Sequence, residues 1–240
     1  MVHTYIEALH DLLFPPQCLC CEQRLDTSRP PLICPSCRDN LRFISSPLCI
    51  TCGMPFPGGE DHLCGSCLRN HYLFDYARSA LFYQSPVSNL LLALKFSNAT
   101  SAVPTLKKIA EQSGMLAHFA VPDIIIPVPL HIGRLRERGF NQALMLARHC
   151  FPQWRTLTHA SLLVRTKATS PQSSLSGQQR RQNLKGCFQL SRSGLLTGKK
   201  ILLVDDVFTT GSTINECSRV LRREKPKRIE VFTVARSLQL

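Results

Sequence analysis

The 240-residue chain lacks any run of 18 apolar residues, the length at which a stretch becomes a candidate for a bilayer-spanning helix. Its first seven residues hold no Lys or Arg and lead into no apolar stretch, so they do not match a secretory signal. These absences exclude a spanning helix and a membrane partner, and they predict a cytoplasmic protein. Cysteines seldom form disulfides in a reducing cytoplasm, which matters because this chain holds twelve of them.

Acidic residues are scarce beyond the first third of the chain. Residues 76–240 carry 24 Lys and Arg against eight Asp and Glu, a net charge of +16, whereas residues 1–75 carry five against eight, a net charge of −3. Between residues 134 and 192, eleven basic residues accompany one acid, Glu137. Such a field attracts polyanions over a Debye length of roughly 8 Å, so we expect any nucleic acid to meet this part of the chain. The simpler alternative is that these charges neutralise a small phosphate ligand and otherwise form a solvated face.

Eight of the cysteines form four Cys-x-x-Cys pairs within residues 18–67. Two such turns can supply four thiolates to one ion, the closed coordination of structural zinc, so eight ligands predict two zinc ions. The predicted ligands are Cys18, Cys21, Cys34, Cys37, Cys49, Cys52, Cys64 and Cys67. The spacing leaves open whether consecutive or interleaved pairs share an ion. Disulfides are the competing interpretation, and Cys20 is expected to be a bystander.

This cysteine-rich region is too short and too rich in Pro and Gly to bury much apolar surface. Zinc binding would therefore supply the folding free energy, on the order of 10 kcal/mol per site. We predict that residues 1–72 form a zinc module, a double zinc ribbon if consecutive pairs share each ion. We expect a short N-terminal helix before the ribbon, with Ile6, Leu9, Leu13 and Phe14 on one face. Residues 73–240 form a second domain.

Apolar periodicity in the second domain alternates between strand and helix, which predicts an α/β fold. We expect strands at 78–83, 123–129, 162–165 and 201–204, and helices at 86–96, 104–119, 142–151 and from residue 213 onward. The continuous apolar run Ile201-Leu-Leu-Val204 is typical of a strand buried on both faces of a parallel sheet.

Residues 201–213 place that strand, two carboxylates and a turn rich in hydroxyl groups in direct succession. Backbone N–H groups and hydroxyls at a helix start suit a phosphate, and Gly211 allows the main chain to approach it closely. Asp205 and Asp206 suit ribose hydroxyls or a magnesium ion. The predicted sugar-phosphate site is Asp205, Asp206, Thr209, Thr210, Gly211, Ser212 and Thr213. An ordinary capped turn between strand and helix is the plainer alternative.

Basic residues follow two other predicted strands. Arg134, Arg136 and Arg138 come after strand 123–129, where ligands of open α/β sheets bind, and guanidinium groups suit pyrophosphate. Arg165 and Lys167 open a polar stretch that ends at residue 185. We expect this stretch to be a loop that closes over the ligand, with a plain polar connector as the alternative.

The strand, acid pair and Thr-Thr-Gly-Ser turn resemble the signature of type I phosphoribosyltransferases, which bind 5-phosphoribosyl-1-pyrophosphate (PRPP). Further stretches make nearly the whole chain similar to the ComF family of competence-associated, phosphoribosyltransferase-like proteins. They are Phe14-Pro-Pro-x-Cys-x-x-Cys21, Asp123-Ile-Ile-Ile-Pro-Val-Pro-Leu130, Arg134-Leu-Arg-Glu-Arg-Gly-Phe-Asn-Gln142 and Gln172-x-x-Leu-Ser-x-x-x-Arg-Arg-x-Asn183. The resemblance implies a type I phosphoribosyltransferase-like fold, a mostly parallel sheet flanked by helices, preceded by a small double zinc ribbon.

The resemblance also implies a cytoplasmic role in natural transformation, in which the protein handles imported single-stranded DNA and carries a PRPP site. Magnesium is expected to accompany PRPP. From the basic field, Arg180, Arg181 and Lys185 are predicted DNA contacts. Tyr83, Phe140 and Phe151 are candidate stacking surfaces, although aromatic residues at such spacing more often belong to the core.

Three functions remain open at this point. The first is a binding protein that holds PRPP and single-stranded DNA. The second is an active phosphoribosyltransferase with an unidentified base or nucleic-acid acceptor, although no pocket for a base is recognisable and no catalytic residue is assigned. The third is an adaptor whose acidic zinc module docks a DNA helicase or translocase.

Overall fold

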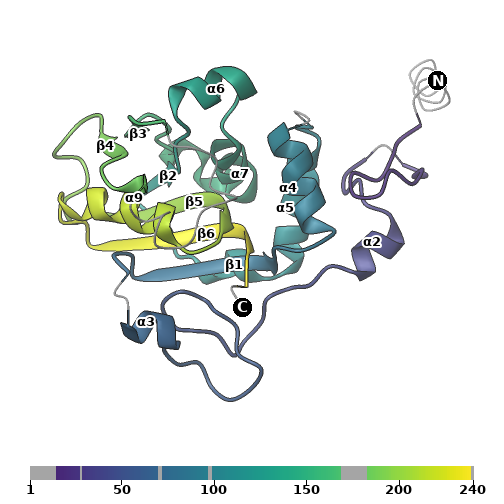
Figure 1. Ribbon diagram of the computed structural model, residues 1–240, viewed down its shortest axis with the longest axis horizontal. Helices are drawn as coiled ribbons and strands as arrows, with labels where there is room; N and C mark the ends of the chain where they lie inside the picture. Colours follow the sequence, from purple (N-terminus) through teal and green to yellow (C-terminus); the bar gives the residue numbers. More distant parts are fainter. Residues whose placement is uncertain (1–14, 28, 70–71, 97–98, 169–182, 239–240) are drawn as a thin grey trace.

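The computed structural model describes the chain except for residues 1–14, 28, 70–71, 97–98, 169–182 and 239–240. A parallel sheet of strand order β1-β6-β5-β2 forms the centre of the described part (Figure 1). Its strands are β1 (Tyr76–Phe82), β2 (Ile124–Pro127), β5 (Lys200–Phe208) and β6 (Arg228–Arg236). The predicted α/β fold with a mostly parallel sheet is confirmed. The N-terminal helix predicted around Ile6 lies outside the described residues.

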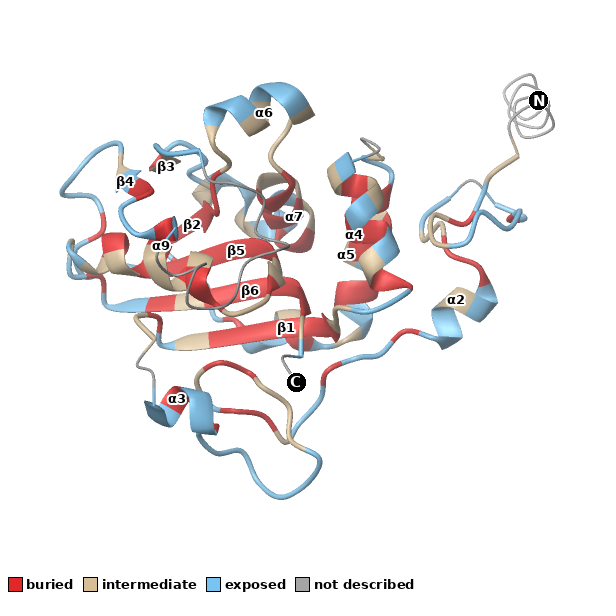
Figure 2. Cartoon of the chain, in the orientation of Figure 1, coloured by how far each residue is buried: buried red, intermediate tan, exposed pale blue. Residues whose placement is uncertain are grey.

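Helices cover both faces of this sheet, which explains the unbroken apolar run in β5. Leu202 and Val204 share one apolar cluster with α4 (Val87–Phe96), α5 (Ala102–Gln112) and α7 (Gln142–Cys150). Ile201 and Leu203 point to the other face and pack with α9 (Ser212–Arg222). Figure 2 shows the resulting band of buried residues along the central strands.

Strand β5 is longer than the sequence pattern predicted. It pairs with β6 as far as Phe208 opposite Arg236, so Asp205 and Asp206 lie inside the strand rather than after it. The apolar pattern stops at the acids, whereas the backbone ladder continues because β6 extends beside them. The position of the acid pair therefore depends on the neighbouring strand.

Two helical predictions need correction. The helix expected at 104–119 ends at Gln112, because Gly114 adopts a left-handed φ of 71°, and the 3-10 helix η1 (Met115–His118) follows. The basic segment after β2 contains the helix α6 (Ile132–Arg138). Its start is capped by His131, whose Nδ1 accepts a hydrogen bond from the Gly133 N–H, and an N-cap histidine is a weak sequence signal.

The remaining described elements are short. Strands β3 (Leu163–Arg165) and β4 (Phe188–Leu190) form a separate antiparallel pair, and the 3-10 helix η2 (Pro152–Leu157) precedes them. Helices α2 (Pro35–Asp39) and α3 (Gly65–Arg69) belong to the cysteine-rich region. No helix among the described residues is long and apolar enough to span a membrane.

The eight predicted ligands form two sets built from consecutive pairs. They are Cys18, Cys21, Cys34 and Cys37, and then Cys49, Cys52, Cys64 and Cys67, with the sulfur atoms of each set within 4.8 Å of one another. Sulfur–sulfur distances of 3.6 Å recur in both sets. A zinc ion with four bonds of about 2.3 Å to sulfur requires an edge near 3.8 Å, so each set fits one zinc ion. These distances are far longer than a disulfide bond of about 2.05 Å.

The two sites contact different parts of the second domain. Beside the first site, the Leu32 N–H donates to Thr105 Oγ1 on α5 (2.9 Å). Beside the second, the Ala77 N–H on β1 donates to the Thr51 carbonyl (2.7 Å). Cys20 belongs to neither set, and its carbonyl accepts from Asn89 Nδ2 on α4 (3.0 Å).

Metal analysis tests the two-site geometry. We expect the purified protein to contain about two zinc ions per chain. Cys37→Ser should contain about one, because Cys37 is a ligand of the first zinc ion only. Inductively coupled plasma mass spectrometry measures both values. A content of one or none in the unsubstituted protein, purified without chelators, would break the eight-ligand model.

Candidate functional site

Asp205 and Asp206 are buried near the carboxyl end of β5, the edge at which parallel sheets bind ligands. Two short backbone hydrogen bonds orient them. The Asp206 N–H donates to Asp205 Oδ1, and the Val207 N–H donates to Asp206 Oδ1, each at 2.9 Å. Because successive strand residues point to opposite faces, Asp205 lies on the α9 side and Asp206 on the α4 side.

Lys95, near the end of α4, forms an ion pair with Asp206 Oδ2. Burial alone would lower the pKa of Lys95, but the charges of Asp206 and Asp205 outweigh burial and raise it. Lys95 therefore stays charged in the site. The sequence analysis missed this residue, because one lysine among the apolar positions of an amphipathic helix gives no signal of a distant partner.

Burial raises the pKa of Asp205 well above its ordinary value, and the charge of neighbouring Asp206 raises it further. Hydrogen bonding from the backbone and the charge of Lys95 oppose this shift without cancelling it. Two carboxylates removed from water next to each other favour a bound cation or hydroxyl donors, either of which offsets the cost of ionisation.

The turn after β5 has a conformation that only glycine fits. Gly211 has a left-handed φ of 72°, and a Cβ there would lie 2.6 Å from the Phe208 ring and 3.0 Å from the Tyr72 ring. Thr210 Oγ1 lies 2.6 Å from Ser212 Oγ. Gly211 is the N-cap of α9 and contributes no side-chain cap, and the first helical turn holds no acid. The Ser212 N–H donates to Thr210 Oγ1 (3.3 Å), and the positive end of the helix dipole, with no acid in its first turn, suits an anion.

A cavity of about 670 Å³, named here the central cavity, joins the acid pair to several of the predicted basic residues. Its predicted members are Asp205, Asp206, Thr209, Thr213, Arg134, Arg138 and Arg165. Lys95, Tyr83, His131 and Gln142 also line it. The sheet order explains this convergence, because β2 pairs directly with β5 and brings the segment after β2 beside the acids.

Other predicted residues do not line the central cavity. Thr210, Gly211 and Ser212 form the turn behind Thr209 and Thr213, while Arg136 and Lys167 are exposed elsewhere. Arg134 and Arg138 line the cavity and Arg136 does not, because α6 is a helix. Residues four apart in a helix lie on the same face, and residue 136 lies on another face. Burial lowers the pKa of Arg138, whose Nη1 donates to Gln142 Oε1 at 2.6 Å.

A second cavity, of about 1010 Å³ and named here the aliphatic groove, lies against the other side of α6. Ile132 and Leu135 of α6 line it, whereas Arg134 and Arg138 line the central cavity. Its walls include Phe140, Leu144, Met145, Pro152 and Val164, and its basic residues are Lys107, Arg148, Arg155 and Arg165. None of the described lining residues is Asp or Glu. Sequence periodicity could not reveal this groove, because its walls come from α5, α6, α7, η2 and β3.

The predicted DNA contacts and the candidate stacking residues lie in different places. Arg180 and Arg181 lie outside the described residues, and Lys185 is exposed but lines neither cavity. Among the candidate stacking residues, Tyr83 lines the central cavity and Phe140 lines the aliphatic groove. The suggestion of Phe151 as a stacking surface was wrong, because this ring is 1% exposed and stacks on Trp154 within the core.

Two family models match the chain. The double zinc ribbon domain matches residues 9–68, and the phosphoribosyl transferase domain matches residues 156–239. The first match, together with the two cysteine sets, identifies these sets as two four-cysteine zinc sites. The second match includes the acid pair and the turn after β5.

Full-length relatives carry names from DNA uptake and use. The chain is 34% identical over 227 residues to "Competence protein F" of Haemophilus influenzae, covering 92% of this chain and 97% of that protein. It is 34% identical to "DNA utilization protein YhgH" of Escherichia coli O157:H7, covering 80% and 85%, and 26% identical to "Competence protein ComFC" of Bacillus subtilis, covering 85% and 84%. The chain therefore belongs to the ComF family, in which a double zinc ribbon precedes a phosphoribosyltransferase domain.

Proposed function

We propose that this protein binds PRPP with magnesium in the central cavity and single-stranded DNA in the aliphatic groove, and that it handles imported DNA in the cytoplasm during natural transformation. One observation carries the PRPP assignment. The acid pair, Thr213 at the start of α9 and three arginines border a single cavity. The names of the relatives support the competence role.

The chemistry of PRPP matches the layout of the central cavity. Its 5-phosphate suits the turn of residues 209–213, and its vicinal ribose hydroxyls suit the carboxylates of Asp205 and Asp206. Arg134, Arg138 and Arg165 suit the pyrophosphate, and magnesium would accompany it and offset its charge. The volume of about 670 Å³ lies within the range of roughly 300–1,000 Å³ that is usual for small-molecule sites.

The ion pair between Lys95 and Asp206 adds a step to ligand binding. Lys95 neutralises the carboxylate that faces α4. Hydroxyl groups or magnesium at Asp206 would compete with this ammonium group, which would then be able to contact a phosphate oxygen. Lys95 also offsets the repulsion between the two acids.

Replacing both acids tests the PRPP site. We expect Asp205→Asn/Asp206→Asn to weaken PRPP binding by roughly 100-fold or more, because two charge-assisted contacts of about 1.5–3 kcal/mol each are lost. Isothermal titration calorimetry in magnesium buffer measures the affinity, and circular dichroism checks the fold. Asp39→Asn, an exposed carboxylate on α2, is the matched control and should bind like the parent. Unchanged affinity in the double variant would remove the pocket assignment.

The raised pKa of Asp205 predicts that this acid reduces stability near neutral pH. Below the ordinary value of about 3.9, the carboxyl is protonated in both states and has no effect. As pH rises from there toward the raised folded pKa, the unfolded state loses the proton first, so stability falls. We expect Asp205→Asn to be more stable than the parent at pH 7 by about 1 kcal/mol or more, a rise of roughly 2–4 °C in Tm.

Thermal unfolding at pH 7 and pH 4 measures this difference. The Asn side chain keeps an oxygen that can accept the hydrogen bond from the Asp206 N–H, so the substitution mainly removes the charge. Because Asp205 of the parent is protonated in more molecules at pH 4 than at pH 7, the gain in stability should be smaller at pH 4. A gain of the same size at both pH values would contradict the assignment.

The aliphatic groove supplies both parts of a site for single-stranded DNA. Phe140 and the aliphatic walls can contact the faces of bases, and Arg148 and Arg155 on α7 and η2 can contact phosphates. The lack of acids among its described lining residues removes like-charge repulsion against a polyanion. Arg180, Arg181 and Lys185 remain predicted further contacts. A helicase or translocase that docks on the zinc module remains an alternative partner.

Neutralising the rim of the groove tests the DNA assignment. We expect Arg148→Ala/Arg155→Ala to bind single-stranded oligonucleotides more weakly, with a log–log salt slope reduced by about 0.7 per lost phosphate contact, or about 1.4 in total. Fluorescence anisotropy over a salt series measures this slope. Arg223→Ala/Lys227→Ala removes the same charge from exposed residues that line neither cavity, and it should leave the slope unchanged. Equal slopes in all three proteins would exclude the groove.

Transfer of the phosphoribosyl group is the alternative to binding. An acceptor must reach the anomeric carbon, yet the acid pair lines only the central cavity, which shares Pro129, Leu130 and Arg165 with the groove. The distance of the groove's other walls from the acid pair favours binding over transfer. Incubating the protein with PRPP, magnesium and candidate bases or DNA while measuring pyrophosphate release distinguishes the two.

A further inference from the structure

We propose that the second zinc site, formed by Cys49, Cys52, Cys64 and Cys67, holds the phosphate-binding turn in place, and that Arg236 is the positioning residue between them. The inference rests on the proposed PRPP function. It assigns the second zinc site a role that the first does not share. Zinc in the second site then controls ligand affinity as well as folding of the ribbon.

Arg236 connects the zinc site to the end of β5. This residue is 3% exposed at the end of β6, and its Nη1 donates to the Cys52 carbonyl (2.6 Å). Its Nη2 lies 3.6 Å from Cys52 Sγ. The same guanidinium stacks 4.5 Å from the centroid of the Phe208 ring, its neighbour across the β5–β6 pair.

The contact of Arg236 with the zinc ligand Cys52 makes this connection depend on the metal. Among the described residues, Arg236 forms no ion pair with a carboxylate, and a buried guanidinium is costly without a compensating charge. A zinc ion held by the four cysteines would tie the turn of residues 49–52 to the turn of residues 64–67, and the site would carry a net charge of −2 beside this guanidinium. Without zinc these two turns would be free to separate, and the Cys52 carbonyl would no longer be fixed for the hydrogen bond from Arg236.

Phe208 contacts both Arg236 and the turn at Gly211. Its ring is 1% exposed and fills the space into which a Cβ at Gly211 would project. Tyr72 covers the other side, 3.0 Å from the same Cβ position, and its hydroxyl donates to the Thr210 carbonyl (3.3 Å). Phe74 stacks on Tyr72 at a centroid distance of 4.8 Å. The left-handed turn thus rests on rings held between the second zinc site and the sheet.

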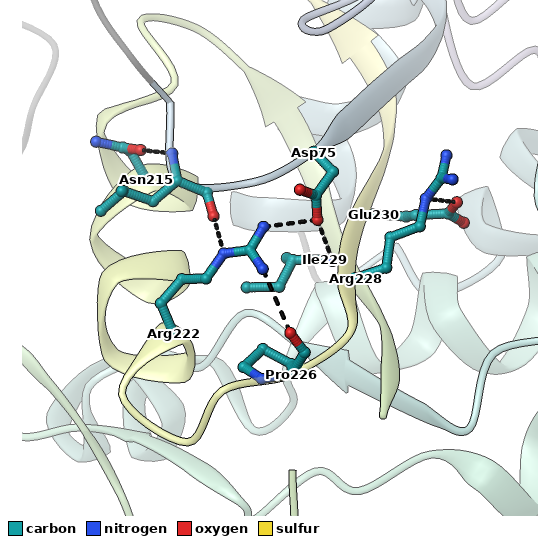
Figure 3. Close-up of polar contacts among 8 residues, drawn as sticks. Asp75, Asn215, Arg222, Pro226, Arg228, Ile229 and Glu230 are labelled. Atoms are coloured by element: carbon teal, nitrogen blue, oxygen red, sulfur yellow. Dashed lines mark hydrogen bonds and ion pairs between the residues drawn. The ribbon is translucent and has the colours of Figure 1, made fainter. Parts of the chain in front are cut away.

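The segment that leaves the zinc module is also fixed to α9. The Leu73 N–H donates to Asn215 Oδ1 (2.7 Å), and Arg222 Nε donates to the Leu73 carbonyl (2.8 Å) (Figure 3). Arg222 Nη2 and the Ile229 N–H both donate to Asp75 Oδ2, at 2.6 and 2.7 Å. These contacts hold Tyr72 beside the turn.

The first zinc site offers a control because its recorded contacts lie elsewhere. Leu32 and Cys20, beside this site, contact Thr105 on α5 and Asn89 on α4. Asn89 lies near the start of α4, about two helical turns from Lys95 at its other end. Loss of the first zinc should therefore leave the turn after β5 intact.

Matched ligand replacements test the proposal. We expect Cys64→Ser, at the second site, to weaken PRPP binding at least 10-fold, and Cys37→Ser, at the first, to change it less than 2-fold, while each variant loses about one zinc ion. Calorimetry and metal analysis give both values. Similar weakening in the two variants would overturn the proposal.

Replacing Arg236 keeps the test valid if Cys64→Ser does not fold. Arg236→Gln should retain about two zinc ions and a normal circular dichroism spectrum yet bind PRPP at least 10-fold more weakly, and Arg236→Lys should recover part of the loss. Parental affinity in Arg236→Gln with full zinc content would overturn the proposal.

Hydrogen exchange separates this inference from the PRPP assignment. Amides of residues 208–214 should exchange faster in Cys64→Ser and Arg236→Gln than in the parent, and at the parental rate in Cys37→Ser. If the parent itself does not bind PRPP, the proposed function fails, while this exchange pattern still supports the positioning role. Parental exchange in all three variants would overturn that role.

Discussion

The site depends on one electrostatic constraint, the burial of two adjacent carboxylates at the edge of a parallel sheet. Pairing of β5 with β2 and β6 holds Asp205 and Asp206 away from water, and burial together with their mutual repulsion raises the pKa of Asp205. Lys95 compensates one of the two charges. The remaining demand for hydroxyl donors or a cation supports the proposed sugar ligand, and the prediction of reduced stability comes from the same two acids.

Helix α6 divides the basic segment between two surfaces. Its 134/138 face borders the acid pair, while Ile132 and Leu135 contribute to an aliphatic groove with basic residues around it. A helix can make this division because residues four apart share a face. In the proposed function, the small anionic ligand and the longer polyanion therefore contact different arginines, apart from Arg165, which borders both cavities.

The zinc module contacts the second domain through its second site. Its chain is rich in turns, and the buried cysteines themselves form much of its interior. The second zinc site lies against β1 and Arg236, and Arg236 contacts Phe208 at the end of β5. A series of contacts therefore runs from Cys52 through Arg236 and Phe208 to the turn at Gly211.

The sequence by itself determined the features that are local in the chain. Cys-x-x-Cys spacing placed eight ligands, and the apolar strand followed by two acids and a Thr-Thr-Gly turn indicated the sugar-phosphate site, because each pattern depends on neighbours a few residues apart. Only the tertiary structure decided the pairing of the cysteine turns, the partner of Asp206, the extension of β5 and the contact of Arg236 with Cys52. These features depend on which distant segments become neighbours when the sheet and the metal sites form, and residue spacing does not encode that choice.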